Sequence, residues 1–177
     1  MDDYSNWKPL PDEQLDWGPM EFDPPKLELE FAFRMRLQLG ARIKMGRVPQ
    51  GGIRGFTAAA GGIIEGPLLN GRVIGGTGGD WPIYRDDHAV VFSAHYMLEA
   101  DDGTKIYLQN KGFRYAPPDV AARQEALEPV GFDEYYMRVT PTFDVETGPH
   151  DWLTKNILVG CAQRNPDHSV FHFYLLK

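Results

Sequence analysis

Hydrophobic and polar residues alternate over residues 27–39, LELEFAFRMRLQL. Charged and amide side chains, from Glu28 to Gln38, occupy most of the intervening positions. A period of two is typical of a β-strand, because successive side chains of a strand point to opposite faces. The pattern therefore predicts a long strand with one face on a hydrophobic core. The apolar face comprises Leu27, Leu29, Phe31, Phe33, Met35, Leu37 and Leu39.

Five later segments have the composition of further strands, each bounded by Gly, Pro, Asn or Asp. They are residues 88–98, 104–115, 132–145, 156–164 and 169–177. The short sequences ADDG (100–103) and RNPD (164–167) separate two pairs of these segments and have turn-forming residues. Such short connections indicate antiparallel hairpins.

Only residues 117–129, PPDVAARQEALEP, have the pattern of a helix, with Pro at the start, an acid in the first turn and Pro129 at the end. One short helix cannot cover a large open sheet, whereas a barrel has no unpaired edges and uses the alternation directly. We therefore expect an all-β protein. Its fold is a closed or nearly closed antiparallel β-barrel of about eight strands with one short helix.

The first 26 residues are rich in Pro and Asp and contain scattered aromatic residues, Tyr4, Trp7 and Trp17. They predict an extended N-terminal arm held by its rings to the barrel or to a second subunit; a flexible tail is the alternative. The domain organisation is then an arm over 1–26 and a barrel over 27–177. We expect a homo-oligomer.

The chain has 18 Lys and Arg residues against 25 Asp and Glu residues, a formal net charge of -7. Without a concentrated basic patch, such a chain is not expected to bind nucleic acid. No stretch approaches the roughly 18 apolar residues of a membrane-spanning helix, so no membrane partner is expected. The single cysteine, Cys161, cannot form an internal disulfide, and no secretory signal pattern is present. We expect a cytoplasmic location.

The stretch GGTGGDWPIY, residues 75–84, has four glycines in five positions. A phosphate-binding loop would need a strand before the glycines and a helix after them. Here Asp80, Trp81 and Pro82 follow, and no helix pattern does. Together with the glycines over residues 61–76, the stretch instead predicts two bending strands, a sharp corner and the rim of a ligand pocket.

Tyr136 and Arg138 share one face of a predicted strand. A phenol donor and a guanidinium fork so close together suit a carboxylate or an enolate oxygen. In the alternative interpretation, Arg138 pairs with a carboxylate of a strand and Tyr136 covers the core.

Three more side chains are candidates for proton transfer. Asp80 beside Trp81 is a candidate general base, since burial in an apolar wall raises a carboxyl pKa; a turn acid bonded to backbone N–H groups is the alternative. Glu65 poses the same choice. His95 is either a proton shuttle or a core histidine with satisfied hydrogen bonds.

On residues 90–98 either face could line the interior, which makes Tyr96 a candidate as well as His95. We expect Trp81, Tyr96, Asn110 and Trp152 to contact a substrate. No His-x-His or His-x-x-x-His spacing occurs, and no Gly-x-Ser-x-Gly motif. We therefore expect no metal and no cofactor.

Three function classes are consistent with these residues. The first is a cofactor-independent isomerase, cyclase or lyase that moves a proton on a small apolar or aromatic carbonyl compound. The second is a binding or carrier barrel that returns a small apolar ligand unchanged. A subunit whose barrel surface mainly serves assembly is a third.

Several segments, in order over residues 27–177, resemble the family known as domain of unknown function 3237, or uncharacterised protein family 311. They are GGIIEGPLLNGRVIGGTGGDW, YMLEADDGTKIYLQNKGFR, YYMRVTPTFDV and WLTKNILVG. The resemblance implies a β-barrel fold and a small bacterial or fungal protein without a firmly established general activity.

Overall fold

The structure is a computed structural model that describes Lys8, Pro11 and residues 24–177. Most of the predicted N-terminal arm, residues 1–26, therefore lies outside the described residues. Ten strand segments pair in antiparallel fashion in one sheet. The strands are β1 (Leu29–Arg47), β2 (Ile53–Glu65), β3 (Gly71–Val73), β4 (Gly79–Asp80), β5 (Ile83–Tyr84), β6 (Ala89–Ala100), β7 (Lys105–Tyr115), β8 (Tyr136–Val145), β9 (Leu158–Arg164) and β10 (His168–Leu176).

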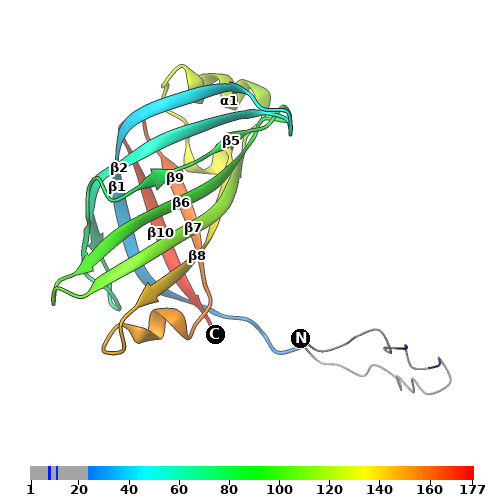
Figure 1. Ribbon diagram of the computed structural model, residues 1–177. Helices are drawn as coiled ribbons and strands as arrows, with labels where there is room; N and C mark the ends of the chain where they lie inside the picture. The colour runs from blue at the N-terminus through cyan, green and yellow to red at the C-terminus, as the bar shows by residue number, and fades with distance from the viewer. Residues whose placement is uncertain (1–7, 9–10, 12–23) are drawn as a thin grey trace.

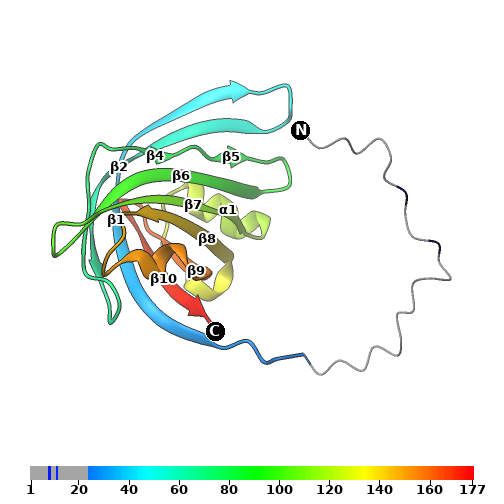
Figure 2. The same cartoon turned by 60° about the horizontal axis from the view of Figure 1, so that its bottom comes forward.

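The sheet closes on itself, because β1 pairs with β10 on one side and with β2 on the other. Segments β3, β4 and β5 each pair with both β2 and β6, so these three occupy a single place in the ring and the ten segments fill eight places. Figures 1 and 2 show the strands wrapping round one interior. The predicted all-β barrel of about eight strands is confirmed.

Strand β1 does not keep one face inward along its whole length. Phe33 and Met35 are fully buried, but Phe31 is 37% exposed and Leu29 is 57% exposed. The register with β10 shifts between Phe31 and Phe33, and a bulge of this kind inverts the alternation of faces on its two sides. The single dry face predicted over residues 27–39 is therefore wrong before Ala32.

The glycine-rich stretch forms a bend and a piece of barrel wall between β2 and β6. A Cβ atom at Gly75 would overlap the carbonyl oxygen of Ala60, and one at Gly78 would overlap that of His95. Gly76 has a φ of 79°, which favours glycine. The absence of side chains thus lets β4 lie close to both neighbours, and this close approach sets Asp80 in the wall.

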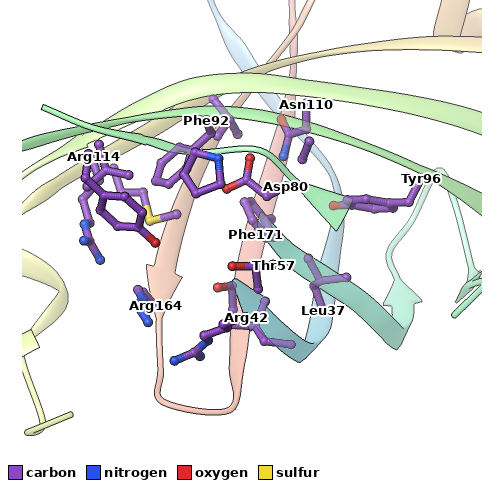
Figure 3. Close-up of a pocket in the computed structure, with 18 residues that line it drawn as sticks. Leu37, Arg42, Thr57, Asp80, Phe92, Tyr96, Asn110, Arg114, Arg164 and Phe171 are labelled. Atoms are coloured by element: carbon purple, nitrogen blue, oxygen red, sulfur yellow. The ribbon is translucent and has the colours of Figure 1, made fainter. Parts of the chain in front are cut away.

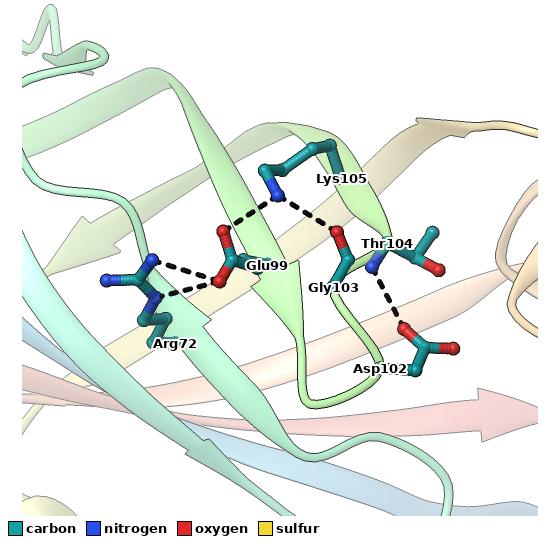
Figure 4. Close-up of polar contacts among 6 residues, drawn as sticks. All are labelled: Arg72, Glu99, Asp102, Gly103, Thr104 and Lys105. Atoms are coloured by element: carbon teal, nitrogen blue, oxygen red, sulfur yellow. Dashed lines mark hydrogen bonds and ion pairs between the residues drawn. The ribbon is translucent and has the colours of Figure 1, made fainter.

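The predicted ADDG turn joins β6 to β7 as a hairpin, with Gly103 at a φ of 91°. Beside this turn, the carboxylate of Glu99 forms ion pairs with Arg72 at 2.9 Å and with Lys105 at 2.8 Å (Figure 4). Hydrogen bonds from these two cations hold the pKa of Glu99 below its usual range. These ion pairs lie on the outer face of the sheet, where exposed ion pairs contribute little to stability.

The predicted RNPD turn joins β9 to β10 as a second hairpin, where the N–H of Asn165 donates a hydrogen bond to the carbonyl of His168.

The two ends of the barrel differ. Helix α1 (Pro118–Glu125), within the predicted helical segment, lies at one end, and the short helix η4 (Asp151–Thr154) lies at the other (Figure 1). A further short helix, η3 (Phe132–Glu134), precedes β8. No helix in the described part of the chain is long and apolar enough to cross a membrane.

Toward the η4 end the interior is packed with apolar side chains. The rings of Phe33 and Phe173 lie 4.9 Å apart between centroids, and both residues are fully buried. Leu98, Ile106 and Leu158 belong to the same cluster. Burial of one such side chain contributes about 1.5–3 kcal/mol to the free energy of folding, so this half of the interior stabilises the barrel. A functional site is therefore expected in the other half.

Candidate functional site

The interior toward the α1 end contains a cavity of about 90 Å³, room for several water-sized groups. Its walls combine apolar side chains with polar and charged ones from different strands (Figure 3). The lining consists of Leu37, Leu39, Arg42, Thr57, Asp80, Pro82, Tyr84, Val90, Phe92, Ala94, Tyr96, Asn110, Arg114, Met137, Val139, Arg164, Ser169 and Phe171.

Asp80 is the only acidic side chain in this lining. Strand β4 holds it between β2 and β6, where it pairs with Thr57 on one side and with Ala94 on the other. Its Oδ1 atom accepts a hydrogen bond of 2.9 Å from the backbone N–H of Ser93. Burial nevertheless raises the pKa of the Asp80 carboxyl to about 6. At neutral pH such a group is close to the point where it can take up or release a proton.

Tyr96 and Asn110 lie on one side of Asp80, on β6 and β7 (Figure 3). Tyr96 is 1% exposed, and its hydroxyl has a weak contact with the sulfur of Met35 at 4.0 Å. Burial, with the charge of Asp80 second, raises the pKa of this phenol far above its usual range, so it stays a donor. Asn110 is 2% exposed, and its Oδ1 has no hydrogen-bond partner among the described residues.

Three arginines lie on the other side of the cavity (Figure 3). Arg114 and Arg164 stand near the ends of β7 and β9 and are half-buried, whereas Arg42 on β1 is exposed at the rim. Burial, and secondly the charge of Arg164, lower the pKa of Arg114 to about 10. Burial and the charge of Arg42 lower the pKa of Arg164. The three like charges therefore act on one another.

Tyr136 and Arg138 do not line the cavity, which corrects their expected placement inside the barrel. On β8 the inward side chains are Met137 and Val139, so the alternating pair points outward. Arg138 lies over the ring of Tyr136, 4.8 Å from its centroid, and also over that of Phe132. Both residues line a groove on the outer surface.

His95 and Trp81 also face outward, because Asp80 and Tyr96 take the alternate, inward positions. The Nδ1 atom of His95 lies 2.6 Å from the hydroxyl of Tyr107. Trp81 is 49% exposed, and its ring packs on that of Phe56 with centroids 4.5 Å apart. Neither side chain reaches the cavity.

Glu65 and Trp152 are distant from the cavity as well. Glu65 is exposed at the end of β2 and forms an ion pair of 2.8 Å with Arg34. Trp152 belongs to η4 at the opposite end of the barrel and packs against the solid part of the core. Of the predicted site residues, the structure thus brings Asp80, Tyr96 and Asn110 together.

None of the three arginines is among the site residues predicted from the sequence. A signal was present for Arg114, which shares the inward face of β7 with Ile106, Leu108 and Asn110. Arg164 likewise continues the inward face of β9 after Leu158 and Ala162. For Arg42 no such signal existed, because the register of β1 with β2 is irregular between Leu39 and Arg42. Across the described part of the chain, no three His, Cys, Asp or Glu side chains gather where they could hold a metal ion.

The fold and its interior define a small β-barrel with a cavity at one end of its interior. The chain belongs to the family of proteins of unknown function DUF3237, whose model matches residues 27–176. A UPF0311 protein of Rhodopseudomonas palustris is 30% identical over 146 residues, which are 82% of this chain and 94% of the relative.

Solved structures show the same barrel. The crystal structure of a Rhodopseudomonas palustris protein of unknown function matches 88% of this chain and 100% of its own, with 28% identity and a TM-score of 0.81. A β-barrel-like protein of Acinetobacter baumannii matches 89% of this chain and 100% of its own, with 30% identity and a TM-score of 0.77. An enzyme from Penicillium herquei matches 89% of this chain and 100% of its own, with a TM-score of 0.66 but only 22% identity, and shares the fold alone.

Proposed function

We propose that this protein is a cofactor-independent enzyme that moves a proton on a small apolar or aromatic carbonyl compound bound in the cavity. The observation that carries the proposal is the position of Asp80, the single carboxyl among the described residues that line the cavity. The ion pairs among the described residues do not include it. A carboxyl with a raised pKa and no cationic partner suits general acid–base catalysis.

The proposed step needs only groups of this chain. Asp80 takes a proton from the carbon next to the substrate carbonyl, the C–H bond breaks, and its electron pair moves to the carbonyl oxygen as an enolate. Tyr96 donates its O–H to that oxygen, a stabilisation that is often the largest catalytic contribution. Return of the proton from Asp80 to another carbon of the enolate gives an isomer. In an elimination, the enolate collapses, the bond to an oxygen leaving group breaks, and that oxygen takes the proton from Asp80. In a cyclisation, the enolate carbon bonds to a second carbonyl carbon of the same ligand, and the oxygen of that carbonyl takes the electron pair and the proton.

The alternative proposal is a carrier that binds a small apolar ligand and releases it unchanged. The apolar walls of the cavity, including Phe92 and Phe171, favour binding in either case. The buried acid favours the enzyme, because a carrier gains nothing from a carboxyl whose ionisation is costly. The barrel is compatible with catalysis, since the Penicillium herquei enzyme has the same fold.

Proton exchange in D₂O tests the proposal without knowledge of the natural substrate. Phenylpyruvate and phenylacetone both have a CH₂ group between an aromatic ring and a carbonyl, and ¹H NMR follows the loss of its signal. We expect the protein to accelerate exchange in at least one probe, and Asp80→Asn to reduce the acceleration about 100-fold or more. Asp86→Asn, an exposed aspartate paired with Arg47, is the matched control and keeps the acceleration.

Equal exchange by the Asp80→Asn variant and the unaltered protein would overturn the proposal. So would binding of both probes without any accelerated exchange, a result that favours the carrier.

Homo-oligomerisation and the cytoplasmic location remain predictions from the sequence. We propose that residues 1–26, with Trp7 and Trp17, contribute to assembly. The mass in solution of the full chain and of a chain lacking these residues tests this, and an unchanged mass contradicts it.

A further inference from the structure

We infer that the cavity selects small organic carboxylates, with Arg114 and Arg164 binding the anionic group and Arg42 closing the site at the rim. The inference deepens the proposed function, on which it rests for the location of the substrate, by naming the substrate class. It does not depend on which group moves the proton.

Positive charge exceeds negative charge in the lining of the cavity. The lining contains three guanidinium groups, of Arg42, Arg114 and Arg164, against the single carboxyl of Asp80. None of the three arginines has an ion pair with a carboxylate of the described residues. Half-buried cations that repel one another and have no ion-pair partner are costly. A bound anion removes that cost and accepts bidentate hydrogen bonds from guanidinium groups.

The cavity has two ends with different polar groups. Arg114 and Asn110 face inward from the same strand four residues apart, a span of roughly 13 Å. At the Asn110 end, a fully buried amide oxygen lacks any donor within the described residues. Unpaired buried polar atoms indicate a missing partner, here a hydroxyl or N–H of the ligand.

The walls between the two ends select the rest of the ligand. Phe92, opposite Gly112 on the neighbouring strand, and Phe171 present apolar surface there. An inorganic anion would fill only the arginine end and leave these walls without contacts, whereas a flat aromatic or apolar body fills them. The ligand that satisfies every group is therefore an apolar or aromatic carboxylate with a hydrogen-bond donor at its far end.

Calorimetric binding of matched probes tests the inference. 4-Hydroxycinnamate has the carboxylate, the flat body and the distal hydroxyl, and 4-hydroxycinnamamide is its neutral counterpart. We expect the carboxylate to bind at least tenfold more tightly at pH 7.5, because hydrogen bonds to charged groups are stronger than neutral ones. The double variant Arg114→Gln, Arg164→Gln should abolish this preference while binding the amide as before, which also shows that the variant is folded.

The matched control is Arg36→Gln, which removes one positive charge from an exposed position outside the cavity lining. It should keep the preference for the carboxylate. Equal binding of the two probes by the unaltered protein, or a preference that survives in the double variant, would overturn the inference. Binding of inorganic phosphate as tight as that of 4-hydroxycinnamate would also overturn it.

The carboxylate inference and the proposed function can fail independently of each other. Asp80→Asn should keep the preference for the carboxylate, since Asp80 is not part of the arginine cluster. A preference that is present without any proton exchange overturns the proposed function alone. Proton exchange that is as fast in neutral phenylacetone as in anionic phenylpyruvate overturns the carboxylate inference alone.

Discussion

Asp80 on β4 lies directly opposite Ala94 on β6, and both side chains face the cavity. Ala94 carries only a methyl group, so the space beside the carboxyl stays open to a ligand. Any larger inward side chain on β6 at this position would occupy that space.

Replacement of Ala94 by Leu is expected to reduce the binding of 4-hydroxycinnamate, and the rate of proton exchange, at least tenfold. The larger side chain fills volume beside Asp80, and overpacking costs about 1–3 kcal/mol of stability at most sites. Calorimetry and NMR measure the two effects. Ala41→Leu, at an exposed position on β1, is the control and should change neither. Undiminished binding by Ala94→Leu would place the ligand elsewhere.

The free energy of unfolding should depend on the ionisation of Asp80. The pKa of this carboxyl is about 6 in the folded protein against 3.8 for the ordinary group. Between these values only the folded state holds the proton, so stability falls as the pH rises through this window, by at most about 3 kcal/mol. Asp80→Asn lacks the fall and should be more stable than the unaltered protein at pH 7.5, by urea denaturation, but not at pH 4.

The ionisation of Asp86 should change the free energy of unfolding with pH in the opposite direction to that of Asp80. Its hydrogen bonds with Arg47 hold the pKa of the carboxyl below the usual range. Stability from this group is therefore present at neutral pH and is lost as the pH falls. A stability advantage of Asp86→Asn at pH 7.5 like that of Asp80→Asn would show that the gain is a general effect of removing acid charge.

Gly78 should tolerate no side chain. A Cβ atom there would overlap the carbonyl oxygen of His95, which is backbone and cannot move without displacing β6. Gly78→Ala is expected to lower the free energy of unfolding by about 2–4 kcal/mol. Gly46→Ala, at a glycine with no atom within 4 Å of such a Cβ, is the control and should be near neutral. Equal effects of the two substitutions would contradict the close approach of β4 to β6.

Substitutions on the outer face of β8 should not change the rate of proton exchange. Arg138 and Tyr136 pack on each other outside the barrel, so Arg138→Gln and Tyr136→Phe are expected to leave exchange and probe binding within about twofold. A tenfold loss in either variant would instead assign a functional role to the outer groove.

The fold was largely predictable, because the alternation that makes a strand is local. The strand predicted over residues 104–115 corresponds to β7, in which more and less buried positions alternate along the whole strand. The bend near Gly75–Gly79 was predictable for a similar reason, since only glycine permits so close a backbone approach. The bulge at Ala32 was not, because it depends on the pairing of β1 with β10.

The site was predictable only in part. Alternation divides a strand into two faces but does not tell which face is inside. From the sequence, either Tyr96 or His95 could therefore face the interior, and only the closed barrel shows that Tyr96 does. The same ambiguity led to the wrong placement of Arg138, where the apolar Met137 and Val139 take the interior.

The sequence by itself determined the strands, their antiparallel turns, the glycine corner and the short helix, since each depends on neighbouring residues. Only the tertiary structure decided which side chains share the cavity. Arg42, Arg114 and Arg164 are far apart in the chain, and they meet because closure of the ring brings β1, β7 and β9 to the same end of the barrel. Their mutual repulsion, which no ion pair with a carboxylate of the described residues offsets, exists only in three dimensions.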